Sequence, residues 1–247
     1  MAQRPVFIPV DVPPYAAAQM VDFQWFPGFA VAQQQRSIAS LHESAERTGI
    51  GSLLDISSKS PNELGVRLSA FNLRVRFGDI TTSVEAWFQS SKVFENGGPF
   101  LEFLTMPGRE IKRDERLRTA GRLREFRLGD EAWPLVPRTG FYDWLYLNGL
   151  EQHPDLAAQL LAFSGFTDIA FNPEKSLNCQ ARSAAMFLGL SQAGCLDAVK
   201  RGREQFIKDV YGFPKSVACE LPRDGQFPLK FDTEDELDQK AALRRSD

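Results

Sequence analysis

The stretch "SVEAWFQSSKVF", residues 83–94, places three polar side chains inside a run of bulky apolar residues. Glu85, Gln89 and Lys92 have the i, i+4 and i+7 spacing of one helix face, so their carboxylate, amide and ammonium groups form a single polar stripe on the predicted helix. Spacing alone favours a solvated face, with Thr82 and Glu85 as a capping box at the helix start.

Two features favour a pocket over a solvated face. Residues such as Trp87 and Phe88 make most of the helix circumference aromatic, which leaves the polar stripe little open surface. Just upstream, "LSAFNL" places Asn72 among apolar neighbours in a predicted strand, where a buried amide needs a partner. Polar groups that converge near aromatic walls are typical of a small-molecule site.

The composition of the 247-residue chain, 43% hydrophobic and 25% charged, is typical of a soluble globular protein. The net charge of −3 gives the whole molecule no bulk attraction to nucleic acid or anionic membranes. The N-terminus lacks the pattern of a signal peptide, and no run of eighteen apolar residues occurs. We therefore expect a cytoplasmic protein without membrane contact.

Cysteine and histidine are too sparse for a disulfide framework or a zinc site. The three cysteines have no CxxC spacing, which fits a reducing compartment. The two histidines, His42 and His153, have no partner nearby in sequence, and we expect both to be structural. The sequence predicts no metal and no cofactor.

Strand patterns dominate the first third of the chain and helix patterns the rest, which predicts an α+β fold, predominantly helical with a small sheet. We expect a single domain over residues 1–230 with an N-terminal extension, followed by a disordered polar tail at 231–247. "GGP" (97–99) lacks a P-loop lysine and is predicted to be a helix-ending turn. The predicted strands are 4–10 (near a sheet edge), 52–58 and 65–77, and the predicted helices are 30–49, 83–94, 100–105, 109–119, 141–150, 154–165 and 178–194.

Three blocks of the chain, "SAFNL", "VEAWFQSSKVF" and "KSLNCQARSAAMFLGL", resemble the signature blocks of the NADAR domain. With "SIASLHESA" and "TGFYDWLYLNGL", the chain resembles the NADAR branch encoded beside DarT-type DNA ADP-ribosyltransferase toxins, in which the NADAR protein is the antitoxin. The resemblance covers roughly residues 5–215. It implies a NADAR fold and an enzyme that removes ADP-ribose from guanine bases of DNA, with ADP-ribose as product and the cognate toxin as a possible partner.

The resemblance also implies roles for individual residues. Glu85 and Lys92 match the acid and the lysine of the family pattern, and Gln89, Asn72 and Asn178 match its polar binding positions. The segment "FTDIAFNPEKSLN" lacks the Trp-Gly that family members carry before the last helix, so the pattern assigns no role to Asp168, Asn172 or Lys175. We expect Asp168 to be catalytic and Asn172 to bind substrate, and we leave Lys175 without a role.

The chemistry suits these residue types. Cleavage of an N-glycosidic bond passes through an oxocarbenium-like ribose, which the Glu85 carboxylate can stabilise. A neutral Lys92 amine can capture the ribose aldehyde as an imine, or act as a base. Aromatic walls lower the pKa of this lysine by desolvation, whereas the nearby carboxylate raises it, and the sequence leaves open which effect dominates.

Residues 109–127 carry eight Lys/Arg and four Asp/Glu, a local net charge of +4 in a protein of net charge −3. Such a run is either a solvated helix face or a groove that contacts DNA phosphates. The second interpretation assigns DNA binding to Arg116, Arg118, Arg122 and Arg124.

A modified guanine is read most readily by stacking outside the duplex. Phe71, Trp87, Tyr142 and Trp144 are candidates, and each alternatively belongs to the core. Asp143 and Asp168 are carboxylates in apolar surroundings, which either touch ligand, cap a helix or pair with an arginine.

Two other functions remain open from sequence. One is an N-glycosidase that acts on riboflavin-pathway intermediates, a role also attached to the NADAR superfamily. The other is a non-catalytic module that binds ADP-ribosylated DNA or the toxin. Turnover of modified DNA distinguishes the function implied by the NADAR resemblance from both.

Overall fold

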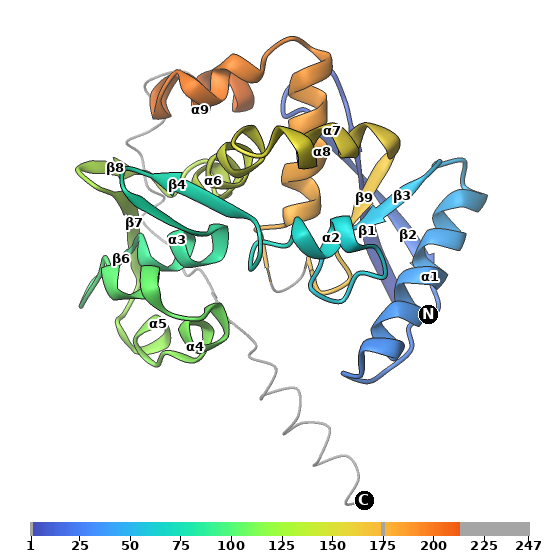
Figure 1. The fold of residues 1–247 in the computed structure, drawn as a ribbon, viewed down its shortest axis with the longest axis horizontal. Helices are drawn as coiled ribbons and strands as arrows, with labels where there is room; N and C mark the ends of the chain where they lie inside the picture. Colours follow the sequence, from blue (N-terminus) through green and yellow to red (C-terminus); the bar gives the residue numbers. More distant parts are fainter. Residues whose placement is uncertain (1, 174–175, 213–247) are drawn as a thin grey trace, which may run out of the picture.

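The computed structural model describes residues 2–173 and 176–212 (Figure 1). Lys175, Cys219 and the predicted tail at 231–247 lie outside the described residues. Within them, no helix combines the length and the apolar composition needed to cross a membrane.

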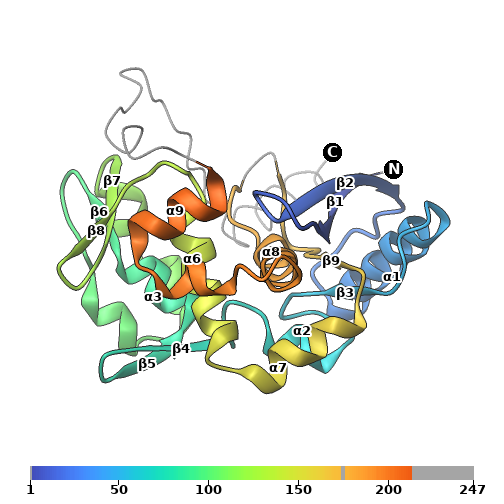
Figure 2. The same ribbon diagram turned by 90° about the horizontal axis from the view of Figure 1, so that it is seen from above.

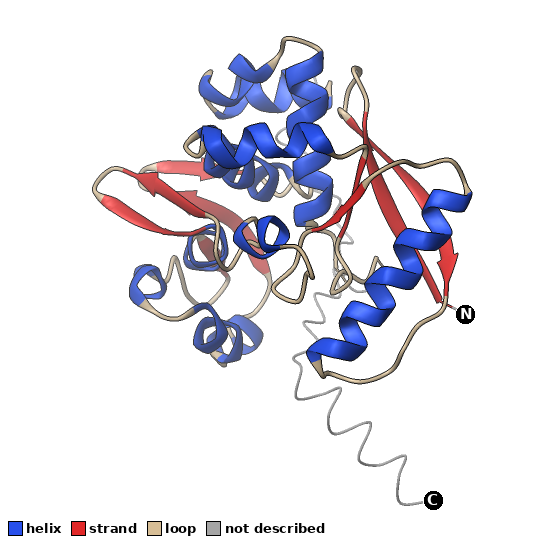
Figure 3. Cartoon of the chain, turned by 45° about the vertical axis from the view of Figure 1, so that its right-hand side comes forward, coloured by secondary structure: helices blue, strands red, loops and turns tan. Residues whose placement is uncertain are grey.

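One side of the molecule is a four-stranded mixed sheet in the order β2–β1–β9–β3. β1 (Ala2–Pro9) and β2 (Ala16–Phe23) form an antiparallel hairpin, and β9 (Gly165–Thr167) runs parallel to β3 (Leu53–Asp55). Helix α1 (Val31–Arg47) packs its apolar face on this sheet (Figure 3) because Ile38, Leu41 and Ala45 recur at helical spacing and join a buried cluster with Val6 and Val21.

The opposite side holds two smaller sheets and several short helices (Figure 1). β4 (Arg74–Phe77) and β5 (Ile80–Ser83) form a hairpin, and β6 (Lys92–Phe94), β7 (Leu123–Leu128) and β8 (Glu131–Trp133) form an antiparallel sheet. The helical segments on this side are α3 (Val84–Ser90), the 3-10 helix η1 (Leu101–Thr105), α4 (Gly108–Arg113) and α5 (Arg116–Thr119). Helix α2 (Glu63–Arg67) lies beside β3 instead, where a Cβ on Gly65 would be 2.0 Å from the Asp55 carbonyl oxygen (Figure 2).

Helices α6 (Gly140–Glu151) and α8 (Gln180–Gln192) lie between the two sides and contact each other (Figure 2). Both are buried over most of their circumference, because apolar residues occupy nearly all faces of each helix. The remaining segments, α7 (Pro154–Gln159), η2 (Leu160–Ala162), η3 (Leu196–Lys200) and α9 (Arg203–Tyr211), pack around them. The prediction of an α+β fold is confirmed.

The predicted helix over 83–94 is too long. α3 ends at Ser90, and Lys92–Phe94 is a strand in which Lys92 pairs with Phe126 of β7. Pairing with β7 replaces the helical hydrogen bonds that would have continued, so Lys92 does not share a helix face with Glu85. The capping residue is Ser83, which accepts from the Ala86 N–H, and the predicted Thr82–Glu85 box is wrong.

The predicted strand over 65–77 is wrong in its first half. Asn62 caps a short helix by accepting from the Leu64 N–H, and only Arg74–Phe77 is extended. The "GGP" turn follows strand β6, not a helix. Gly98 there has φ +89, and a Cβ would lie 2.1 Å from the Lys92 carbonyl oxygen, so glycine is required beside this lysine.

β1 lies next to the edge strand β2, as predicted for a strand near a sheet edge, and β9 pairs with β1 only at Phe7–Phe166, so Pro5 and Pro9 lie clear of that ladder. Smaller errors concern element boundaries. The predicted helix at 109–119 is interrupted at Asp114, and the one at 154–165 ends early and runs into β9. Helices predicted at 30–49, 141–150 and 178–194 are confirmed to within two residues at each end.

Candidate active site

Glu85 lies in the first turn of α3, with its backbone N–H donating to the Ala70 carbonyl at 2.9 Å. Its carboxylate is buried, with the residue 6% exposed. The Gln89 amide, one turn later, donates to Glu85 Oε1 at 2.9 Å, and Lys112 Nζ lies 3.8 Å from the same oxygen. Oε2 accepts no hydrogen bond from the described residues, so one carboxylate oxygen is held and the other is available to a ligand.

Lys92 is one of the largest fully buried side chains among the described residues. Its amine lies 4.8 Å from the centre of the Phe88 ring. Burial lowers the pKa of Lys92 to about 7. The Glu85 carboxylate raises this pKa, and the Lys112 ammonium lowers it further. Desolvation therefore outweighs the adjacent carboxylate, and near neutral pH a large fraction of Lys92 is the free amine.

Asp168 follows β9 and is half-buried. The Ala170 N–H donates to Asp168 Oδ1 at 3.0 Å. Burial and the charge of Asp55 raise the pKa of the Asp168 carboxyl to about 7. Burial, Glu85 and then Asp168 also raise the pKa of Tyr142, so the tyrosine lies within the electrostatic reach of both carboxylates. The structure thus brings the segment after β9 near the Glu85 side of the site.

Several buried polar atoms around these groups have no hydrogen-bond partner among the described residues. They are Gln89 Oε1, Ser69 Oγ and Asn178 Oδ1. Buried polar atoms are normally satisfied, and leaving one unpaired costs about 1–3 kcal/mol. Gln89, whose other amide atom holds Glu85, is therefore well suited to accept a hydrogen bond from a bound hydroxyl or amide.

The candidate aromatic residues separate into two groups. Phe71 is half-buried, and Lys112 Nζ lies 4.4 Å from its ring centre, so Phe71 adjoins the Glu85 site. Trp87 belongs to the core: its indole N–H donates to the Val75 carbonyl at 3.0 Å, and its ring meets Phe77 edge-on. Trp144 is likewise buried, with its indole N–H donating to the Val199 carbonyl.

The predicted polar contacts also differ in position. Asn72 is exposed in a turn, not buried in a strand, and its amide donates to the Val66 carbonyl at 2.8 Å, which stabilises the turn after α2. Asn172 and Asn178 are half-buried in the segment that joins β9 to α8. Of the predicted amides, Gln89 is the one that directly contacts a predicted catalytic residue among the described residues.

Sequence reasoning missed three residues that build the site. Lys112 was hidden in a mixed-charge run. Gln180 accepts from the Ala70 N–H and donates to the Ile56 carbonyl, both at 2.7 Å, and so fixes the loop that carries Phe71. Its position inside the "NCQARSAAMF" block was the available signal.

Asp55 is the third missed residue. It is buried and accepts from Ser57 Oγ at 2.6 Å, from the Ile169 N–H at 2.9 Å and from Thr167 Oγ1 at 3.2 Å. These bonds anchor the segment next to Asp168. Burial raises the pKa of Asp55 to about 6.

The other titratable candidates have structural partners. Asp143 is buried, pairs with Arg182 and accepts a hydrogen bond from Ser183 Oγ at 2.6 Å. Of the alternatives that the sequence left open for Asp143, pairing with an arginine is therefore the one observed. His42 Nε2 lies 2.9 Å from Thr167 Oγ1, and His153 Nδ1 lies 2.8 Å from the Gly149 carbonyl oxygen. No group of three or more His, Cys, Asp or Glu side chains in residues 2–173 and 176–212 is placed to hold a metal ion.

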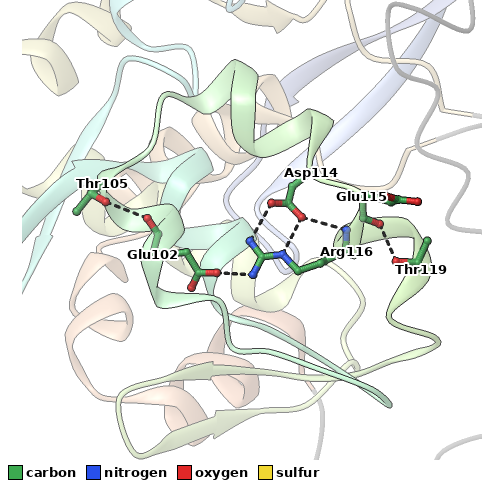
Figure 4. Close-up of polar contacts among 6 residues, drawn as sticks. All are labelled: Glu102, Thr105, Asp114, Glu115, Arg116 and Thr119. Carbon is green, nitrogen blue, oxygen red and sulfur yellow. Dashed lines mark hydrogen bonds and ion pairs between the residues drawn. The ribbon is translucent and has the colours of Figure 1, made fainter.

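The four arginines predicted to bind DNA are not equivalent. Arg116 is held by Asp114 and Glu102 (Figure 4), with the Asp114 Oδ2 oxygen 2.8 Å from its guanidinium, and Arg124 pairs with Glu95. Arg118 and Arg122 are exposed, and neither side chain forms an ion pair within the described part of the chain. Arg118 and Arg122 are therefore more available than Arg116 and Arg124 to bind a phosphate.

On this α+β fold, the candidate site thus combines the buried Glu85 carboxylate, the buried Lys92 with a lowered pKa and the Asp168 carboxyl with a raised pKa. The sequence model of the DarT1-associated NADAR antitoxins matches residues 2–218. The chain belongs to this family of DarT1-associated NADAR antitoxins, and a DarT toxin is its cognate partner. A search among curated proteins returned no match.

Proposed function

We propose that this antitoxin is a hydrolase that removes ADP-ribose from guanine bases of DNA and so reverses the modification made by its DarT-type toxin. The observation that carries the proposal is a buried Glu85 carboxylate within electrostatic reach of a buried Lys92 whose pKa is about 7. The reaction needs an anion beside a ribose cation and a neutral nucleophile or base, and these two residues can supply both. We further propose that it acts in the cytoplasm without a metal or cofactor.

In the proposed first step, the lone pair of the Lys92 amine forms a bond to the anomeric carbon of the ribose. The bond from that carbon to the guanine nitrogen breaks at the same time, and its electron pair leaves with the base. Glu85 stabilises the positive charge that develops on the ribose. Asp168, whose pKa of about 7 leaves part of it protonated at neutral pH, donates the proton that the departing guanine needs.

In the second step, water adds to the anomeric carbon and the lysine nitrogen leaves as the free amine. Glu85 accepts a proton from the attacking water, and free ADP-ribose is released. Gln89, Asn172 and Asn178 are the proposed polar contacts of the substrate, and Phe71 the proposed stacking surface for a base outside the duplex.

The test is incubation of the purified full chain with an oligonucleotide that carries one ADP-ribosylated guanine. Mass spectrometry should show the unmodified oligonucleotide and stoichiometric ADP-ribose. Retention of the modified oligonucleotide without release would support a non-catalytic binder instead. Turnover of aminopyrimidine ribosides with no action on modified DNA would support the riboflavin-pathway alternative. Either outcome contradicts the proposal.

A further inference from the structure

Lys112 is placed over the site by the packing of α4. Its side chain is 51% exposed, and its Nζ contacts Glu85 Oε1 at 3.8 Å and the Phe71 ring at 4.4 Å from the ring centre. One turn earlier on the same helix, Gly108 packs so closely on Phe71 that a Cβ would lie 2.8 Å from its Cδ1 atom. Gly108 and Lys112 thus meet Phe71 from one helix face, which fixes the position of the ammonium.

Glu85 thus contacts Lys112 directly and also acts electrostatically on Lys92, and the two lysines have very different surroundings. Lys92 is buried, with 1% of its surface exposed, whereas Lys112 remains in contact with water. A single carboxylate compensates one positive charge well. The charge of Lys112 on Glu85 therefore offsets part of the attraction that this carboxylate exerts on the buried Lys92 amine.

We propose that Lys112 is a positioning residue that occupies Glu85 as a permanent cation and thereby keeps Lys92 in its amine form. This proposal rests on the proposed function only for the role of the Lys92 amine as nucleophile; the effect of Lys112 on the pKa of Lys92 does not depend on it. The role belongs to Lys112 because its ammonium contacts the same carboxylate oxygen that Gln89 holds.

The electrostatic environment of Lys92 supports this role. The charge of Lys112 lowers the pKa of Lys92, and that of Glu85 raises it. From the neighbouring strand β7, Glu125 and Arg127 pair with each other, and Arg124 pairs with Glu95, so these charges are largely compensated. Lys112 also acts on Asp168: its ammonium lowers the pKa of that carboxyl, as it lowers the pKa of Lys92.

The direct test is an NMR titration of the Lys92 Cε resonance in the full chain labelled with 13C-lysine. In Lys112→Met, we expect the pKa of Lys92 to rise by about one pH unit, because a nearby cation is removed and Glu85 then acts on Lys92 alone. Lys112→Arg, which keeps the charge, should restore a pKa close to that of the wild type. Arg109→Met, which removes an exposed charge from the same helix, is the matched control and should leave the pKa unchanged.

An unchanged or lowered Lys92 pKa in Lys112→Met, with a wild-type-like spectrum elsewhere, would overturn the proposal. This readout needs no substrate, so it stands or fails independently of the proposed reaction. With modified DNA as substrate, the whole pH–rate profile of Lys112→Met should move to higher pH by about one unit, with the rate at pH 7 reduced about threefold. A loss of equal size at every pH would show that Lys112 only binds substrate, and would also overturn the proposal.

Discussion

Lys92 owes its low pKa to its place on strand β6, where burial removes the water that would hydrate an ammonium. In the unfolded chain the pKa returns to about 10.4, so between about pH 7 and pH 10 the unfolded state binds the extra proton. This difference makes the contribution of Lys92 to stability unfavourable at neutral pH, and the penalty disappears as the pH rises toward 10. The site therefore keeps a neutral amine at the expense of some stability.

The two groups with pKa values of about 7 predict a bell-shaped pH–rate profile centred near pH 7. The rising limb follows deprotonation of Lys92, and the falling limb follows deprotonation of Asp168, so the rate approaches a tenfold change per pH unit below 6 and above 8. Asp168→Asn should lower the maximum and abolish the falling limb while the rising limb stays. Single-turnover rates from pH 5 to 9 measure this. A wild-type profile that is flat across pH 6–8 would exclude both assignments.

Helix α8 connects the large sheet to the site. Near its C-terminal end, Gly189 lies against the β1–β2 hairpin, and at its first residue Gln180 holds the Ile56 and Ala70 backbone. The position of the loop that carries Phe71 therefore depends on how closely α8 approaches the hairpin. The same logic explains why the chain keeps glycine in the middle of a helix, where it is intrinsically unfavourable.

Gly189→Ala tests this coupling. A Cβ would lie 2.2 Å from the Tyr15 carbonyl oxygen and 2.4 Å from that of Val10, so α8 has to move. We expect the free energy of unfolding to fall by about 3 kcal/mol, as overpacking against backbone does. Gln192→Ala, at an exposed position of the same helix, is the control and should change it by less than about 0.5 kcal/mol. Urea unfolding measures both, and equal stabilities of the two variants would refute the close packing.

At the scale of the whole molecule, the sequence predicted the elements whose pattern is local. The apolar spacing of α1 and the largely apolar sequences of α6 and α8 identify these helices without tertiary information. Glu85 and Gln89 were correctly predicted to lie one turn apart. The strand at Lys92 was missed because its hydrogen bonds come from β7, about thirty residues later, which no local pattern reveals.

The same reason explains the other misses. Lys112 reaches Glu85 from α4, and Asp55 reaches the Asp168 segment from β3, so their roles exist only after the chain has folded. Conversely, Asn72 and Trp87 matched a pattern expected at a site, but backbone carbonyls nearby take up their side-chain N–H groups. Residue type and spacing therefore do not show which side chains are engaged by nearby backbone carbonyls, because those contacts form only in the folded chain.

The basic run over 109–127 is spread over α4, α5 and β7 at one end of the molecule (Figure 1). Because Arg118 and Arg122 are exposed and form no ion pair among the described residues, we expect Arg118→Ala/Arg122→Ala to weaken DNA binding. The slope of log affinity against log salt should decrease by roughly 1.4 to 1.8, as the loss of two phosphate contacts requires.

Arg116→Ala provides the comparison within this run. It removes the ion pairs to Asp114 and Glu102, so it should lower the thermal midpoint and leave the salt slope unchanged. Fluorescence anisotropy with a labelled oligonucleotide at several salt concentrations gives the slopes. An unchanged slope in the Arg118/Arg122 variant would show that these arginines only solvate the surface.

The most direct measurement is the single-turnover release of ADP-ribose from guanine-modified DNA at pH 7 by Glu85→Gln and Lys92→Met. Glu43→Gln and Lys208→Met, which alter the same residue types at exposed positions, are the matched controls. Lys92→Met should fold well, because it replaces a buried amine with an apolar side chain. We predict that both site variants bind modified DNA but release ADP-ribose at least about 100-fold more slowly than wild type, with the controls unchanged. Release at the wild-type rate by either site variant would contradict the assignment of Glu85 and Lys92 as the catalytic pair.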